Sequence, residues 1–383
     1  MPNRSSSFDV AVVGAGAIGL AVAWRAAQRG LKVLVLERGE HPGAGTSSVA
    51  AGMLAPISEA LASERPLIRL GMASAEAYPD FVAELSEMTG MDTGYLRCGT
   101  LLGARDRDDA EWLERERELR ETLDLPVQRL RASQARELEP ALAPTLRLGL
   151  GIPDDHAIDP RKLTAALAEA LRKSGGELRT RTTVNAVTTA RERVMGITLG
   201  DGSEVAAENV VVAAGPWSSS LDGIPEGARV PIHPIKGQIL RLHDPAGPGL
   251  LTRVLRMTGG YVVPRGDGRY VIGATMEERG FDRTVTAGAA FELLRNAFEL
   301  LPSVTELVID ELSAGLRPAT PDNAPAIGPG SIEGLHWAVG HYRHGILLTP
   351  ITAELVAGAL TGNPAVPEDF APTRFAAGVT VTA

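Results

Sequence analysis

Three glycines near the N-terminus, Gly14, Gly16 and Gly19, have the spacing of a phosphate-binding turn. In such a turn the first glycine permits a tight strand-to-helix connection, the second lets a pyrophosphate approach the backbone, and the third lets helix and strand pack closely. The phosphates then lie at a helix N-terminus, where backbone N–H groups favour negative charge. Taken alone, this spacing also fits a plain connection between a strand and a helix.

The segments around the glycines occur in the order that a dinucleotide-binding unit requires. Residues 8–13 are nearly all apolar, residues 17–29 carry apolar residues around a helix, and residues 31–36 are again apolar. Gly30 is suited to end the helix. The order strand, turn, helix, strand therefore predicts a β-α-β unit that begins at residue 8.

Two charged residues after the second predicted strand bear on the identity of the dinucleotide. The carboxylate of Glu37 can accept hydrogen bonds from the adenosine ribose hydroxyls and would repel a 2′-phosphate. The next residue, Arg38, could pair with such a phosphate, face solvent or stack on adenine. We predict FAD as the cofactor, with NAD as the alternative.

Helices and strands alternate along the rest of the chain. Helical spacing is found over residues 66–90, 106–123 and 286–301, and the pair Asp159-Pro160 is suited to start a helix over residues 160–174.

Strands are expected within residues 177–214 and 230–275, with turns at Asp201-Gly202 and Gly266-Asp267-Gly268. Residues 39–56 are rich in Gly, Ser, Ala and Pro, and we expect them to form a long loop against something that needs close backbone approach, such as a cofactor.

These elements predict an α/β protein of α+β character, in which a Rossmann-like FAD-binding domain is interleaved with a substrate-binding domain built on a mixed sheet. The length of 383 residues favours more than one structural unit. We assign residues 1–85, 150–225 and 320–383 to the FAD-binding domain, and residues 86–149 and 226–319 to the substrate-binding domain.

Composition argues against several other classes of protein. The formal net charge is −9 and no dense Lys/Arg cluster occurs, so neither nucleic acid nor an anionic membrane is an expected partner. Residues 1–7 are polar and the apolar run after them is interrupted by glycines, so we expect no signal peptide or anchor and a cytoplasmic location. Cys98 is the only cysteine, which excludes an internal disulfide and a cysteine-rich metal site.

Several segments together resemble the D-amino-acid oxidase superfamily of flavoenzymes, and within it the glycine oxidases of thiamine biosynthesis. Besides the glycine turn, the matching segments are GTSSVAAGML at 45–54, VAAGPWS at 212–218, YVVPR at 261–265, AGLRPAT at 314–320 and GHYRHGILLTP at 340–350. The resemblance covers nearly the whole chain. It implies an enzyme that uses FAD to oxidise a small amine or amino acid.

The resemblance also implies a substrate site that contains Arg317, Tyr261, Arg343, Met276 and Met53. Arg317 would hold the substrate carboxylate, because a planar guanidinium can donate two parallel hydrogen bonds to it, and the Tyr261 hydroxyl would donate another. The structural alternatives are a loop arginine and a strand tyrosine with its ring in the core. Arg343 would either bind substrate or neutralise charge on the flavin, and the two methionines would limit the space at the α-carbon.

A larger set of residues is expected to bind FAD. These are Gly14, Ala15, Gly16, Ala17, Ile18, Gly19, Glu37, Arg38, Thr46, Ser47, Ser48, Ala51, Gly52, Met53, Val184, Ala214, Gly215, Trp217, Arg343, His344, Gly345, Ile346 and Leu347. The backbone amides of the last segment precede a helix and would stabilise the negative charge of reduced flavin.

FAD is expected to be non-covalent, because relatives with covalent flavin attach it through a cysteine in the C-terminal, substrate-side region, where this chain has none. No metal is expected. His341 and His344 are three residues apart, but no cluster of Asp, Glu or Cys accompanies them in the sequence, so we interpret them as loop histidines near the cofactor.

The leading hypothesis is oxidative deamination of glycine, sarcosine or small D-amino acids with O2, giving a keto acid or imine, ammonia or amine, and H2O2, and supplying the thiazole branch of thiamine biosynthesis. In this family a hydride passes from the substrate α-carbon to flavin N5, so positioning is the main contribution of the protein. The alternatives are a D-amino-acid or sarcosine dehydrogenase that reduces a quinone or carrier, and a non-catalytic dinucleotide-binding module. Assembly into a homo-oligomer is compatible with each of these functions.

Overall fold

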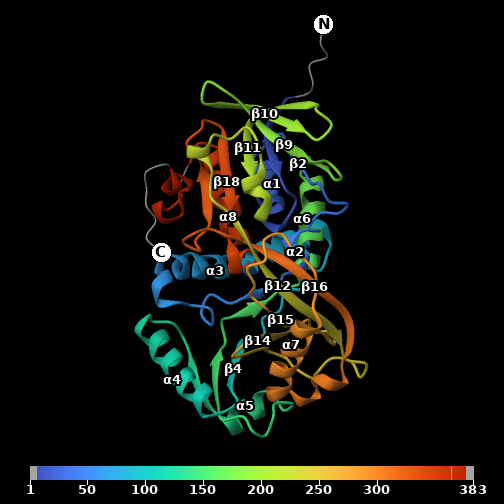
Figure 1. Cartoon of the computed structure of the whole chain (residues 1–383), viewed down its shortest axis with the longest axis vertical. Coiled ribbons are helices and arrows are strands. Elements are labelled where there is room, and N and C mark those ends of the chain that lie inside the picture. The colour runs from blue at the N-terminus through green and yellow to red at the C-terminus, as the bar shows by residue number, and fades with distance from the viewer. Residues whose placement is uncertain (1–6, 364, 377–383) are drawn as a thin grey trace.

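Two eight-stranded mixed sheets organise the residues that the computed structural model describes, 7–363 and 365–376. They form two parts that lie end to end along the long axis of the molecule, with α2, α3, β12 and β16 near the junction (Figure 1). The predicted fold class is confirmed. No helix in the described ranges is long and apolar enough to cross a membrane.

The first sheet has parallel strands at its centre, with β1 between β2 and β11. The central strands are buried on both faces, which explains why their sequences are continuous apolar runs. The strand order is β17 (Ala326–Pro329), β18 (Leu335–Val339), β11 (Glu204–Val212), β1 (Phe8–Val13), β2 (Val33–Leu36) and β8 (Glu177–Arg179), with β10 (Arg193–Leu199) and β9 (Val184–Ala190) continuing from β11.

Helices cover one face of this sheet, and the β9–β10 hairpin packs on the other. The helices are α1 (Ala17–Gln28), α3 (Arg65–Thr89), α6 (Pro160–Lys173) and α8 (Thr349–Leu360). The Asp159 carboxylate accepts hydrogen bonds from the N–H groups of Arg161 and Lys162, so the predicted start of α6 is confirmed.

The second sheet is built on the long antiparallel pair β12 and β16. Its order is β16 (Val308–Ala319), β12 (His233–His243), β15 (Arg269–Gly273), β14 (Gly260–Pro264), β13 (Val254–Met257), β4 (Thr100–Ala104), β6 (Leu148–Ile152) and β5 (Gln128–Arg131). The associated helices are α4 (Arg107–Thr122), α5 (Ala132–Leu138) and α7 (Ala287–Leu300). The hairpin turns predicted at residues 201–202 and 266–268 are confirmed.

The long loop expected over residues 39–56 contains two short elements that the sequence did not predict. The segment contains the short helix α2 (Thr46–Val49) and the strand β3 (Met53–Leu54), which pairs with β7 (His156–Ala157). Sequence periodicity could not show elements this short, because four residues complete barely one helical turn.

The division into domains stays a prediction. Strand β6 lies across the predicted boundary at residue 150, since all of it belongs to the second sheet. Residues 1–6, 364 and 377–383, which were assigned to the FAD-binding domain, lie outside the described residues.

Candidate cofactor and substrate site

A cavity of about 1200 Å³ lies between the two parts of the molecule and receives residues from both sheets. Pockets for drug-sized ligands measure roughly 300–1,000 Å³, so this one has room for a larger ligand such as a dinucleotide. Its lining includes the glycine turn and residues of β12, β14 and β16 of the second sheet.

The glycine turn has the geometry that its spacing predicts. Gly14 has φ +106°, and a Cβ there would lie 2.5 Å from the carbonyl oxygen of Ala213 on the neighbouring chain segment. A Cβ on Gly19 would collide with the carbonyl of Gly14, so the third glycine allows α1 to approach the turn. Gly16 lines the cavity at the N-terminus of α1. The turn can therefore receive a pyrophosphate.

Glu37 lines the cavity at the end of β2, where it is held by the backbone. Its Oε2 accepts a hydrogen bond from Ala15 N–H (2.9 Å), and its Oε1 accepts one from Gly39 N–H (2.8 Å). A carboxylate fixed beside the turn fits the expected role of ribose acceptor.

Arg38 stacks on a tryptophan. Its guanidinium carbon lies 3.7 Å from the centroid of a Trp217 ring, and that side chain stacks in turn on Phe281 with centroids 6.0 Å apart. Burial is the main cause that lowers the pKa of Arg38. Arg38 and Trp217 both line the cavity, so this aromatic platform borders the same end of it as Glu37.

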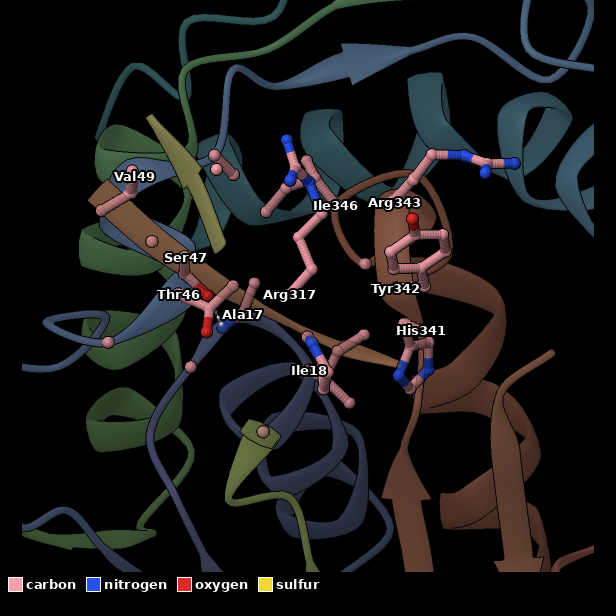
Figure 2. Close-up of a pocket in the computed structure, with 18 of the residues that line it drawn as sticks. Ala17, Ile18, Thr46, Ser47, Val49, Arg317, His341, Tyr342, Arg343 and Ile346 are labelled. Atoms are coloured by element: carbon pink, nitrogen blue, oxygen red, sulfur yellow. Dashed lines mark hydrogen bonds between the residues drawn. The ribbon is translucent and has the colours of Figure 1, made fainter. Parts of the chain in front are cut away.

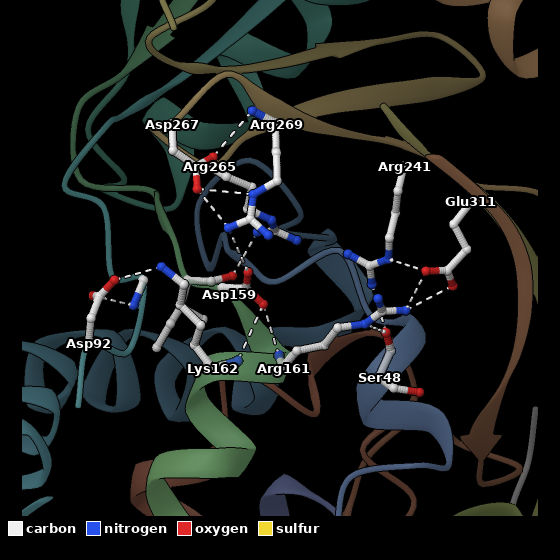
Figure 3. A network of polar contacts seen from close by, with 12 residues as sticks. Ser48, Asp92, Asp159, Arg161, Lys162, Arg241, Arg265, Asp267, Arg269 and Glu311 are labelled. Atoms are coloured by element: carbon white, nitrogen blue, oxygen red, sulfur yellow. Dashed lines mark hydrogen bonds and ion pairs between the residues drawn. The ribbon is translucent and has the colours of Figure 1, made fainter. Parts of the chain in front are cut away.

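Helix α2 is fastened to the second sheet. The Thr46 hydroxyl donates to the carbonyl of Leu316 on β16 (2.7 Å). Arg241 and Arg161 both donate to the Ser48 carbonyl, at 2.7 and 3.0 Å, and Arg161 also pairs with Glu311 (Figure 3). Thr46 and Ser47 lie on the cavity side near Ala17 (Figure 2), and the Ser47 hydroxyl accepts a hydrogen bond from Ala17 N–H (3.0 Å).

The segment before α8 presents free amides at the cavity. The carbonyls of Ile346 and Leu347 accept hydrogen bonds from the side chains of Tyr78 (2.8 Å) and Ser74 (2.6 Å) on α3. Within the described ranges, the N–H groups of these two residues have no acceptor. Ile346 lines the cavity, so these donors and the glycine turn together fit a flavin dinucleotide.

Arg317 reaches the cavity from β16 and lies across its neighbour β12. A Cβ on Gly237 of β12 would collide with the guanidinium, so a glycine makes this placement possible. Nη1 of Arg317 donates to the carbonyl of Thr275 (3.2 Å). Figure 2 shows the side chain among the residues that line the cavity.

Tyr261 of β14 lines the same region. It packs over Gly273 of β15, where any Cβ would overlap its ring. Burial raises the pKa of Tyr261, while the charge of Arg317 acts in the opposite direction. The hydroxyl is therefore protonated at neutral pH and can act as a donor near Arg317.

The remaining predicted substrate residues are placed differently from one another. Met53 and Met276 both line the cavity, but Met276 is 62% exposed, and its sulfur lies 3.3 Å from the Tyr342 hydroxyl. Arg343 forms an ion pair with Glu64 (3.2 Å), and in Figure 2 its guanidinium points away from Arg317.

Most residues expected to bind FAD line the cavity, but some do not. The exceptions are Ala15, Gly19, Ser48, His344 and Leu347. Ser48, for example, donates its hydroxyl to the carbonyl of Gly45 (2.9 Å) and contributes through its backbone to the fastening of α2. His344 is buried, and burial lowers its pKa, so it is neutral at neutral pH.

Sequence reasoning missed Glu59 and Arg256, which both line the cavity. Glu59 lies 3.5 Å from Nη2 of Arg256 and 3.7 Å from Nδ1 of His344. Burial alone would raise the pKa of Glu59, but the positive charges around it, that of Arg256 first and those of Arg343 and Arg317 after it, lower it, so the carboxylate is ionised. Neither residue belongs to a motif, and no sequence signal could have found them.

Comparisons with known proteins agree with this geometry. The model of the FAD dependent oxidoreductase family (DAO) matches residues 9–359. Glycine oxidase from Geobacillus kaustophilus is 37% identical over 91% of this chain and 92% of its own length. Its crystal structure superposes with a TM-score of 0.89 and 35% identity, covering 96% of this chain and 99% of that one.

A second group of relatives is longer than this chain. The bifunctional protein ThiO/ThiG of Synechocystis sp. is 35% identical over 97% of this chain. The chain spans about half the length of that relative, 54%.

Proposed function

Because the chain belongs to the FAD dependent oxidoreductase family, as its motifs indicated, we propose that it oxidises glycine and other small amino acids or amines with O2. FAD is its cofactor. The observation that carries the proposal is the Arg317 guanidinium, which lies in the cavity that also contains the glycine turn. A cation placed there selects substrates with a carboxylate.

The residues of the site position the substrate. When bound, FAD supplies an acceptor for a hydride from the substrate α-carbon. Arg317 would hold the substrate carboxylate, and the Tyr261 hydroxyl would donate a further hydrogen bond to it. Two fixed contacts to one carboxylate limit the rotation of the α-carbon, which lowers the entropic cost of reaching a reactive geometry. Met53 would restrict the space beside the α-carbon.

The free amides before α8 would act on the cofactor itself. The hydroxyls of Tyr78 and Ser74 on α3 donate hydrogen bonds to the carbonyls of Ile346 and Leu347, so these carbonyls point toward α3. The N–H groups of these residues would then stabilise negative charge at the edge of the flavin, as fixed donors do for a developing oxyanion.

The test is anaerobic reduction of the flavin against glycine, sarcosine, D-alanine, D-proline and L-amino acids, followed by a peroxide assay in air. We expect glycine, sarcosine or a small D-amino acid to bleach the flavin and, in air, to yield peroxide. Dye reduction without peroxide would indicate a dehydrogenase, and a flavin that no small amine reduces would indicate a binding module.

We also propose non-covalent FAD, a cytoplasmic location and a role in supplying the thiazole branch of thiamine biosynthesis. The lone cysteine, Cys98, lines a separate cavity of about 340 Å³ beside Tyr270. Flavin that remains with the chain after acid precipitation would contradict non-covalent binding.

A further inference from the structure

Glu59 is a buried carboxylate with unused acceptor capacity on the cavity wall. Its side chain is 14% exposed, and the structure gives its two oxygens no hydrogen bond with any described residue. Its nearest polar neighbours, the Arg256 guanidinium and the neutral imidazole of His344, stay at 3.5 and 3.7 Å. Because buried charged groups normally make hydrogen bonds, this carboxylate is suited to a donor that enters the cavity.

The backbone before Glu59 is held from both sides, so the position of this carboxylate is fixed. Asp155 accepts hydrogen bonds from the N–H groups of Ile57 (3.1 Å) and Ser58 (2.8 Å). Arg120 donates to the carbonyls of the same two residues, at 3.1 and 2.8 Å. Arg256 also donates to the Ser58 carbonyl. Such complete support is typical of residues that must present a side chain at a defined place.

Glu59 and the expected carboxylate clamp belong to one site. Both line the cavity, and the charges of Glu59 and Arg317 both act on the hydroxyl of Tyr261, in opposite directions. The cavity therefore has an anion and a cation close to the same tyrosine. An amino-acid zwitterion carries the complementary pair of charges.

We propose that Glu59 binds the ammonium group of the substrate while Arg317 holds its carboxylate. This inference rests on the proposed oxidation of amino acids. It makes Glu59 a specificity residue that favours amino acids over 2-hydroxy acids of the same size, because a hydroxyl lacks the positive charge that the carboxylate would recognise. The competing role is purely structural, in which Glu59 only neutralises Arg256.

The experiment compares glycine with glycolate in the FAD-loaded protein and in Glu59→Gln. The Kd of glycine comes from the concentration dependence of anaerobic flavin reduction, and that of glycolate from the perturbation of the flavin absorbance. At pH 7 we expect glycine to bind roughly 30-fold more weakly or worse in the variant, the scale of removing one partner of a buried charge pair. Glycolate should bind equally well or more tightly, because the variant removes a negative charge from the site.

Glu64→Gln is the matched control. Glu64 pairs with Arg343 and does not line the cavity, so its loss removes the same charge without removing an acceptor from the site. We expect it to change the affinities for glycine and glycolate in the same direction. Glu59→Asp keeps the charge and should restore most of the preference for glycine, which also protects the test if Glu59→Gln folds poorly.

Raising the pH from 7 to 10 gives an independent readout. The ammonium of glycine loses its proton over this range, so binding by the wild type should weaken, whereas Glu59→Gln should show little loss. The two titratable neighbours of Glu59 do not complicate this readout, because burial lowers the pKa of His344 and raises the pKa of Tyr261. The other charged groups that face Glu59 are Arg256, Arg343 and Arg317, and guanidinium groups are not deprotonated in proteins.

Two failures are distinguishable. If the wild type neither binds nor oxidises any amino acid, the proposed function is wrong. If the wild type oxidises glycine and Glu59→Gln shifts glycine and glycolate equally, or leaves glycine unaffected, the role of Glu59 as ammonium acceptor is overturned.

Discussion

Single residues determine what the cavity can bind. The position of the Arg317 side chain, for example, requires a glycine at position 237. Its guanidinium lies where a side chain at position 237 would be. Nη1 donates to the carbonyls of Thr275 (3.2 Å) and Lys236 (3.4 Å), and the described part of the chain gives Nε and Nη2 no acceptor. The rest of its donor capacity is therefore available for a ligand.

Arg317→Ala should abolish saturable binding of carboxylate substrates while FAD stays bound. Loss of charge-assisted hydrogen bonds worth about 1.5–3 kcal/mol each predicts a decrease in affinity of roughly 100-fold. Anaerobic flavin bleaching measures the affinity for glycine, and the absorbance spectrum checks that FAD is retained. Unchanged turnover would refute the assignment of Arg317.

Asp155 should make stability depend on pH. Burial raises its pKa to about 6, so the folded state binds this proton more tightly than the unfolded state, where the ordinary value near 3.8 applies. Its contribution to stability is thus fully present below about pH 4 and is lost as the pH rises through 6.

Asp155→Asn removes this titration. Relative to the variant, the free energy of unfolding of the wild type should fall by about 2.5 kcal/mol between pH 4 and pH 7.5. Urea unfolding of both proteins across this range provides the measurement. Parallel pH profiles for the two proteins would contradict an ionisation at this position.

At the scale of elements, Arg265 joins the end of β14 to two segments of the other part. One terminal nitrogen donates to the carbonyl of Ile158 (2.9 Å) and the other to that of Ala51 (2.8 Å), and Ala51 lines the cavity. Burial lowers the pKa of this arginine to about 10, which leaves it charged at neutral pH.

Arg265→Met should weaken FAD binding by about 10-fold or more, because two buried carbonyls lose their donors at about 1–3 kcal/mol each. Arg269→Met on β15 is the matched control, since that arginine is about half exposed and pairs with Asp267 at the surface. Such pairs contribute only about 0–1 kcal/mol. Fluorescence titration of the apoprotein with FAD compares the two, and equal losses would argue against a positioning role for Arg265.

The sequence predicts well those helices and strands that are determined by residues close together in the chain. Strand β1, helix α1 and the start of α6 follow from apolar periodicity and from the cap at Asp159, which act within a few residues. Arg317 and Tyr261 were found through motifs. Their placement over Gly237 and Gly273 depends on strand pairing between distant segments, which no local pattern specifies.

Glu59 shows why the rest of the site could not be predicted. It follows β3 in a stretch without periodicity, and it becomes notable only because Arg256 of β13 and His344 lie beside it. Proximity among three separate segments is a property of the tertiary fold. Likewise, the glycine turn and the strand after it predicted Glu37 as the acceptor for the adenosine ribose. They could not predict that two backbone amides hold its carboxylate.

For the whole molecule, the cavity lies at the junction between the two sheets. Residues from both line it, and α2 is fastened across the junction by Arg161, Arg241 and Thr46. A ligand that fills the cavity therefore contacts both parts at once.

Removal of FAD should destabilise both parts together. FAD at 100 times its Kd should raise the free energy of unfolding by about 2.7 kcal/mol, provided that the unfolded chain does not bind it. Calorimetry of the apo and FAD-loaded protein should show one transition that moves to higher temperature with FAD. Two transitions, of which FAD moves only one, would show that the parts are not coupled through the cavity.

The order of strands in the first sheet has a consequence for how the protein is made. Its centre places β1 beside β11, and β11 beside β18. The amides that we propose to face the flavin follow β18. The cavity therefore cannot close before the segment that follows β18 has left the ribosome. A nascent chain that stops before residue 340 lacks these amides, and we expect it to be unable to hold the flavin.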